Sequence, residues 1–254
     1  MWQDAPGSWA VSGGMGPTRY AGDLSEDLSL SLLRPGWSVS GGGSYRISNR
    51  LTARADARLY YIYGKHEGGR VYYNNLSFYA LNPDVWAGLQ ADLWPITANR
   101  GVIPYVFAGL GMTYLTPKAS YRGQSVSLAP LRTEGIIYNR LPGIFTYGVG
   151  VPMRLNIRSW LKLEMSYTHV LNDYLDDVST RYPDFSQLTA LGAAVSDRRP
   201  ELGLPPNRPG DQRGNPPARD GYFIASVRLA YMLSTPARRQ YGQSRQSPRF
   251  RRGR

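Results

Sequence analysis

Apolar and polar side chains alternate along this chain in runs of roughly ten residues, and this period of two restricts its fold more than any other feature. The clearest run, residues 222–233, has one face made of Phe223, Ala225, Val227, Leu229, Tyr231 and Leu233. Residues 51–63 and the run from Trp160 repeat the pattern, and weaker runs lie near Ser8–Met15, Gly36–Arg46, Ser77–Trp94, Ile103–Leu115 and Ile144–Leu155. The periodicity therefore predicts eight β-strands, with irregular pairing expected at Pro83 and Pro152.

The links between these runs alternate in length. Short links follow the second, fourth and sixth runs, at Ile47–Arg50, Ile96–Val102 and Asn156–Ser159. The other links are long and polar, and the last extends over residues 172–219. An up-and-down membrane barrel has short periplasmic turns and long external loops, whereas a soluble sandwich has no reason to keep its two ends so different. An even strand count also places both termini on the short-turn side.

The composition is compatible with a membrane barrel and excludes a helical membrane protein. No run approaches the roughly 18–20 consecutive apolar residues that a spanning helix needs, and the mean hydropathy is negative. Only every second residue of a membrane barrel faces lipid, so its average hydropathy resembles that of a soluble protein. The chain has no Cys, which excludes disulfides and thiolate metal sites.

Aromatic residues lie near the ends of the predicted strands, as the interfacial girdles of a membrane barrel require. The turn-side group is Trp94, Tyr105, Trp160 and Tyr231, and the loop-side group is Tyr61, Tyr63, Phe78, Tyr147, Tyr222 and Phe223. The alternative is a soluble barrel in which these aromatic side chains form the core and the charged face is solvated.

We therefore predict an all-β fold, an eight-stranded antiparallel transmembrane β-barrel with long loops on one side and short turns on the other. The expected parts are an N-terminal extension (residues 1–7), an outer-membrane β-barrel (8–233) and an Arg-rich disordered tail (234–254). The expected location is the outer membrane of a Gram-negative cell envelope. Residues 1–6 do not resemble a signal peptide, so we expect a processed chain or a truncated start.

The polar faces of the predicted strands carry charges of both signs, which would point into the barrel lumen. These lumen charges are Arg54, Asp56, Arg58, Asp92, Arg154, Lys162, Glu164 and Arg228. An eight-stranded barrel has an interior just wide enough for side chains. We therefore expect paired charges in a packed interior, and favour this over a conducting pore.

The C-terminal tail contains seven Arg and no acidic residue from Pro236 onward. The arginines are Arg238, Arg239, Arg245, Arg249, Arg251, Arg252 and Arg254. Such a segment buries too little apolar surface to fold alone, and it predicts an electrostatic contact with an anionic partner. Without a folded nucleic-acid module beside it, we expect no nucleic-acid partner.

The sequence offers few residues for catalysis, and we predict no catalytic, cofactor or metal site. The only histidines are His66, in a loop, and His169, near the end of a strand and on its lipid side. Acidic residues cluster only in residues 172–180. A calcium site is conceivable there, but the spacing matches no EF-hand, and a turn held by Asx hydrogen bonds is favoured.

Residues 168–182, which read THVLNDYLDDVSTRY, resemble the TDYLDDVSxxY stretch of the PorG-like outer-membrane barrels. Three shorter stretches resemble the same family in the same order: residues 20–24, 75–78 and 213–216. The family-motif loop consists of Asp173, Tyr174, Leu175, Asp176, Asp177, Val178 and Ser179.

The resemblance implies a role in the type IX secretion system, which exports proteins across the outer membrane and supports gliding motility in some bacteria. It also implies a non-enzymatic component that contacts outer-membrane lipid and a periplasmic ring formed by a lipoprotein and its partner. The alternatives are a general structural or ligand-binding outer-membrane barrel and, from another class, a lipid-modifying barrel enzyme.

Overall fold

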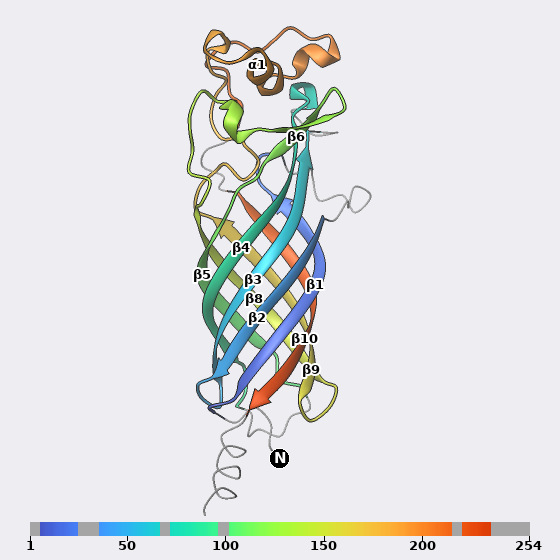
Figure 1. The fold of residues 1–254 in the computed structure, drawn as a ribbon, viewed down its shortest axis with the longest axis vertical. Coiled ribbons are helices and arrows are strands. Elements are labelled where there is room, and N and C mark those ends of the chain that lie inside the picture. Colours follow the sequence, from blue (N-terminus) through green and yellow to red (C-terminus); the bar gives the residue numbers. More distant parts are fainter. Residues whose placement is uncertain (1–5, 25–35, 67–71, 96–101, 215–219, 235–254) are drawn as a thin grey trace, which may run out of the picture.

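A computed structural model of the chain describes residues 6–24, 36–66, 72–95, 102–214 and 220–234. In these residues eight long strands form a closed antiparallel ring, in the order β3-β2-β1-β10-β9-β8-β5-β4, with β3 pairing with β4. The strands are β1 (Trp9–Ala21), β2 (Gly36–Arg46), β3 (Leu51–Lys65), β4 (Ser77–Asp92), β5 (Tyr105–Thr113), β8 (Gly143–Arg154), β9 (Ser159–Val170) and β10 (Gly221–Ser234). They tilt around a common axis, with the turns at one end and the long loops gathered at the other (Figure 1).

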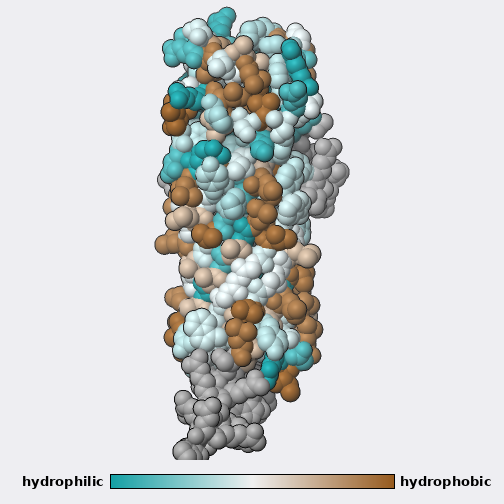
Figure 2. All heavy atoms as spheres, viewed as in Figure 1, coloured by the Kyte–Doolittle hydropathy of each residue, from teal (hydrophilic) through white to brown (hydrophobic). Residues whose placement is uncertain are grey.

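The barrel is inverted relative to a water-soluble protein, because its charged side chains point inward and its apolar ones outward. Along β3 every second residue from Thr52 to Arg58 is buried. The outer wall exposes large apolar side chains such as Leu110 and Val227, at 66% and 48% of their surface. Figure 2 shows apolar residues along the wall and hydrophilic ones mostly around the loop end. Such a continuous apolar surface requires lipid as its solvent.

The predicted strands correspond to the eight strands of the ring, with three local differences. Strand β1 continues to Ala21, well beyond the predicted run. Pro83 and Pro152 pair in register with Leu59 and Lys162, so the irregular pairing expected there was wrong. The carbonyl of Pro83 accepts from Tyr114 N at 3.0 Å, on the β5 side. Because N and O of one residue point to the same side of an antiparallel strand, the missing N–H of Pro83 leaves the β3 pairing intact.

Three of the aromatic girdle assignments were also wrong. Phe78 and Tyr222 are buried inside the barrel, as is Tyr105 on the turn side. All three lie at inward positions of the strand alternation. The alternation decides which face of the sheet a side chain lies on, even for a residue close to the end of its strand. Tyr147 and Tyr231 do lie on the outer face, each more than a third exposed.

Residues 114–142 and 171–214, here called the cap, fold together at the loop end. They contain a hairpin that the sequence did not predict, β6 (Lys118–Tyr121) with β7 (Gln124–Ser127), which pairs with β4 through Tyr79. They also contain α1 (Ala190–Ser196) and the 3₁₀ turns η4 (Ala129–Leu131), η5 (Phe185–Gln187) and η6 (Arg199–Leu202), while η2 (Tyr72–Asn74) precedes β4. None of the helices in the described residues is long and apolar enough to span a membrane.

Candidate functional site

The middle of the lumen is filled by two arginines and two carboxylates. Arg54 binds both oxygens of Glu164, at 3.0 and 3.1 Å, and also Asp56 at 2.9 Å. Arg228, on β10, pairs with Asp56 and donates to Ser12 and Ser40 on the strands between them. Because every charge is neutralised by a hydrogen-bonded partner, the cluster is stable only as a unit: removing one partner leaves a buried charge.

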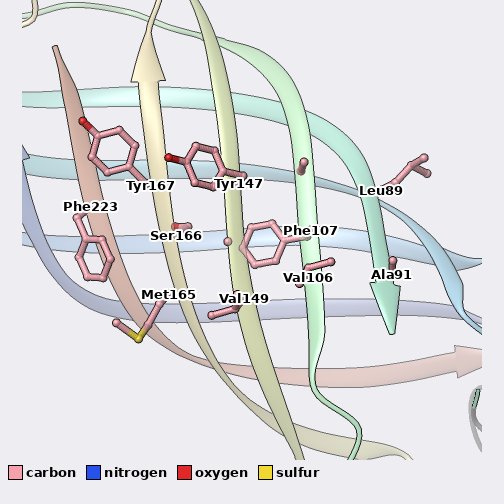
Figure 3. Close-up of a pocket in the computed structure, with 12 residues that line it drawn as sticks. Leu89, Ala91, Val106, Phe107, Tyr147, Val149, Met165, Ser166, Tyr167 and Phe223 are labelled. Carbon is pink, nitrogen blue, oxygen red and sulfur yellow. The ribbon is translucent and has the colours of Figure 1, made fainter. Parts of the chain in front are cut away.

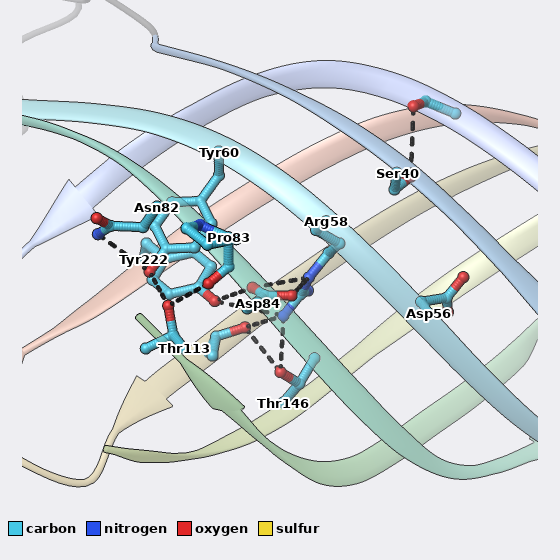
Figure 4. A network of polar contacts seen from close by, with 12 residues as sticks. Ser40, Asp56, Arg58, Tyr60, Asn82, Pro83, Asp84, Thr113, Thr146 and Tyr222 are labelled. Atoms are coloured by element: carbon cyan, nitrogen blue, oxygen red, sulfur yellow. Dashed lines mark hydrogen bonds and ion pairs between the residues drawn. The ribbon is translucent and has the colours of Figure 1, made fainter. Parts of the chain in front are cut away.

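A second cluster lies nearer the loop end, around Arg58 and Asp84 (Figure 4). The Nε of Arg58 donates to the two carboxylate oxygens of Asp84 at 2.8 and 3.0 Å. Tyr222 donates to the same carboxylate, and its ring stacks on Tyr60 with centroids 4.0 Å apart. Arg58 also reaches Thr146 at 3.1 Å, so four strands (β3, β4, β8 and β10) are tied together at this level.

Trp86 joins the two clusters. The guanidinium carbons of Arg54 and Arg58 lie 5.1 and 5.7 Å from its ring centroid. At the turn end a third pair completes the interior, because Arg46 binds Asp92 at 2.6 Å and Thr52 at 2.8 Å. The described lumen thus holds cationic and anionic side chains stacked in layers along the barrel axis.

Most of the predicted lumen charges meet in these clusters. Arg154 lies apart from them, and Lys162 adjoins the central cluster through Tyr105, which donates to Glu164. Arg154 is exposed at the end of β8, where its Nε donates to the backbone of Asn156. The ammonium of Lys162 lies over the Tyr105 ring, 5.5 Å from its centroid. Sequence reasoning missed Arg46 and Asp84, although both occupy inward positions of their strands. If the alternation is continued through Pro83 without a break in the strand, it predicts that Asp84 points into the lumen.

The cap is organised around a buried Glu134–Arg213 ion pair with a 3.0 Å contact. The Glu134 carboxylate also accepts from the backbone N of Ser179 at 2.8 Å and from the hydroxyl of Thr180 at 2.6 Å. Arg213 in turn donates to the backbone oxygen of Asp177 at 2.5 Å. Residues 134, 177–180 and 213 are therefore locked to one another, although they are far apart in sequence.

The family-motif loop forms the inner layer of this cap. Leu175 and Val178 are completely or almost completely buried, and the carboxylate of Asp177 accepts from Thr133 and from Tyr138. Burial raises the pKa of Asp177 to about 6. The predicted Asx turn is confirmed at Asp176, whose Oδ1 accepts from Val178 N at 2.8 Å. The sequence did not predict that this loop would be buried, because its acidic composition resembles that of a solvated turn.

Two of the cap carboxyls share one tyrosine hydroxyl. The Oη of Tyr20, near the end of β1, lies 2.7 Å from Asp176 and 2.7 Å from Asp220, the residue before β10. A phenol has a single hydrogen to donate, so both short contacts can form only if one carboxyl keeps its proton and donates it. Burial accordingly raises the pKa of both Asp176 and Asp220.

The two histidines contact a backbone carbonyl and a tyrosine hydroxyl, respectively. His66 is buried, with Nε2 3.3 Å from the carbonyl of Asp23. His169 faces outward as predicted, with Nε2 3.5 Å from the hydroxyl of Tyr147. No group of three or more His, Asp or Glu side chains in the described ranges is arranged to hold a metal ion.

Comparison with known proteins gives structural likeness only. No protein-family model and no curated protein matches the chain. OprG from Pseudomonas aeruginosa aligns over 92% of this chain and 100% of its own, with 12% identity and a TM-score of 0.48. Neisserial surface protein A aligns over 89% and 97%, with 11% identity and a TM-score of 0.44. Ail of Yersinia pestis, solved with the heparin analogue sucrose octasulfate, aligns over 90% and 99%, with 14% identity and a TM-score of 0.42.

The chain is an eight-stranded outer-membrane β-barrel. Its closed antiparallel ring, apolar outer wall, short turns and long opposite loops are those of the outer-membrane barrel class. The loops mark the external end and the turns the periplasmic end. The resemblance to the PorG-like family stays a prediction.

Proposed function

We propose that this barrel is a non-enzymatic component of the type IX secretion and gliding machinery, which docks to the periplasmic ring formed by a lipoprotein and its partner. The observation that carries the proposal is the position of the family-motif loop. The residues that resemble the PorG-like barrels are those around which the cap is built, with Leu175 fully buried and Asp176 bound to Tyr20. A motif with this many buried contacts is under structural constraint, which favours a shared fold over a chance match.

The filled lumen supports a docking role over a conducting role. Paired arginines and carboxylates occupy the interior at three levels, from Arg46–Asp92 through Arg54–Glu164 to Arg58–Asp84. Moving them aside would leave buried charges unpaired, at a cost of about 3–5 kcal/mol for each broken pair. Exported proteins therefore pass beside this barrel, and its contribution is to anchor and position other components.

The C-terminal tail supplies the expected contact on the periplasmic side. Strand β10 ends at Ser234 at the turn end, where β1 also begins (Figure 1). The tail arginines, in residues 236–254, lie outside the described residues. Their charge suits an acidic partner surface, and such a contact weakens with salt because exposed charges are screened over about 8 Å at physiological ionic strength.

The test is recovery of the ring lipoprotein and its partner with the tagged full-length barrel from envelopes in mild detergent. We compare the parent with a deletion of residues 236–254 and with a full-length variant in which all seven tail arginines are replaced by Gln. Both changes should leave heat-modifiable mobility of the barrel intact and reduce recovery of the ring, as should raised salt with the parent. Unchanged recovery with both variants would refute tail docking, and normal secretion after deletion of the whole gene would refute the secretion role.

A general structural barrel is the second candidate, and the self-sufficient cap favours it. Several buried polar groups of the family-motif loop find their partners within the chain, for example Asp177 with Tyr138 and Ser179 with Glu134. Such a barrel would stabilise the envelope without a dedicated partner. Deletion of the gene would then increase detergent sensitivity of the cells and leave protein export unchanged.

A further inference from the structure

A groove of 680 Å³ crosses the outer wall of the barrel where β4, β5, β8, β9 and β10 lie side by side (Figure 3). Its volume falls within the range of about 300–1,000 Å³ that ligand clefts occupy. A second groove of 320 Å³ shares Val149 and Met165 with the first and continues to Gly16 and Pro17 of β1. The two therefore form one apolar trough that touches six of the eight strands of the ring.

The trough exists because small side chains alternate with large ones on the lipid face. Ala108 and Ala225 lie at outward positions between bulkier neighbours and form part of its floor. Tyr167 leans toward the loop end over Gly221, where an added Cβ would come within 2.3 Å of its hydroxyl. In Figure 3 Tyr147 and Tyr167 border the upper side of the groove, while Val149 and Met165 lie below them.

Polar groups gather at the loop-side edge of this apolar surface. Arg19 occupies an outward position between the buried Thr18 and Tyr20, and its register partner on β10 is Phe223, which lines the groove. His169 lies one outward position beyond Tyr167 on β9, and their rings meet edge to face with centroids 4.7 Å apart. The Nε2 of His169 is also 3.5 Å from the Tyr147 hydroxyl.

We propose that the trough is a specific site for a phosphorylated glycolipid of the outer leaflet. An acyl chain lies along the floor between Ala108 and Ala225, and the phosphate binds Arg19 at the loop-side edge, with His169 and the tyrosine hydroxyls beside the sugar. The apolar lining suits an acyl chain and the guanidinium suits a phosphate. The polar edge lies at the external end, which selects an outer-leaflet lipid over a phospholipid of the periplasmic leaflet.

The test uses the full-length barrel, purified and folded in detergent, with lipid A as the probe and native mass spectrometry to count bound lipid. Arg19→Gln should weaken lipid A binding by about fivefold to tenfold, because one interfacial cation is lost. Ala225→Leu should reduce binding by filling the floor. The matched controls are Lys65→Gln and Ala57→Leu, which change outward residues of β3, away from the trough, and should bind as the parent does. All variants must keep heat-modifiable mobility.

Lipid A without its phosphates tests phosphate recognition separately from acyl-chain binding. It should bind the parent more weakly than lipid A does, and Arg19→Gln should not weaken it further. Inorganic phosphate should not compete, because without the acyl chain it lacks most of the contacts. Equal retention of lipid A by the parent and by both trough variants would overturn the site. Equal retention of phosphorylated and dephosphorylated lipid A by the parent would overturn phosphate recognition.

Discussion

Removing one partner of the Arg58–Asp84 pair should destabilise the barrel far more than removing both. The side chain of Asp84 is completely buried, and that of Arg58 is 5% exposed. Arg58→Leu would leave the carboxylate with the Tyr222 hydroxyl but no opposing charge. Uncompensated buried charges of this kind cost about 3–5 kcal/mol, whereas an apolar pair of similar volume is often neutral. We therefore expect Arg58→Leu to lose 3–5 kcal/mol, and the double variant with Asp84→Leu to recover most of it.

The measurement is urea unfolding of the barrel in lipid vesicles, followed by tryptophan fluorescence and by heat-modifiable mobility. Trp86 is a suitable reporter, since its ring lies 5.7 Å from the Arg58 guanidinium carbon. Arg154→Leu is the matched control, because Arg154 is exposed at the turn end, and it should change stability by less than about 0.5 kcal/mol. If the double variant were as unstable as Arg58→Leu alone, burial of the unpaired charge could not be the reason.

Three further predictions concern the wall, the interior and the cap. Val227→Arg and Leu163→Arg should each impair assembly, because both residues face lipid and an arginine at the midplane costs about 2–4 kcal/mol. Ser226→Arg changes a residue on the lumen side and should impair assembly less. If heat-modifiable mobility showed Ser226→Arg to be the more damaging change, the inside–outside assignment would be reversed. Planar-bilayer recordings of the isolated barrel should show negligible conductance, and stable large unitary currents would contradict a filled lumen. The raised pKa values of Asp177 (about 6) and Asp220 (about 8) mean that the folded cap favours their protonated forms. The stability that these two carboxyls contribute is therefore fully present below their unfolded pKa and is lost as the pH rises through about 6 and about 8. Protease cleavage within residues 171–214 should become faster over that range, and an Asp220→Asn variant should respond less.

The barrel could be predicted from the sequence because one physical rule, alternation between lipid and lumen, acts on every strand. That rule fixed the inward side of Arg54 and the outward side of Val227 without knowledge of their partners. It does not say which charges meet, since Arg54 and Glu164 are 110 residues apart and come together only through ring closure. The cap could not be predicted, because no short-range period governs it. Its buried centre combines Glu134, Asp177 and Arg213 from distant segments, and each of them alone resembles an ordinary surface residue.

The shared hydroxyl of Tyr20 has a consequence for the order of assembly. Its two carboxyl partners come from the family-motif loop and from the residue that precedes the last strand, whereas Tyr20 itself belongs to the first. All three meet beside the seam at which β1 and β10 close the ring. The innermost layer of the cap therefore cannot form until the last strand has paired with the first. A folded cap on the external side therefore indicates that the ring of strands in the membrane has closed.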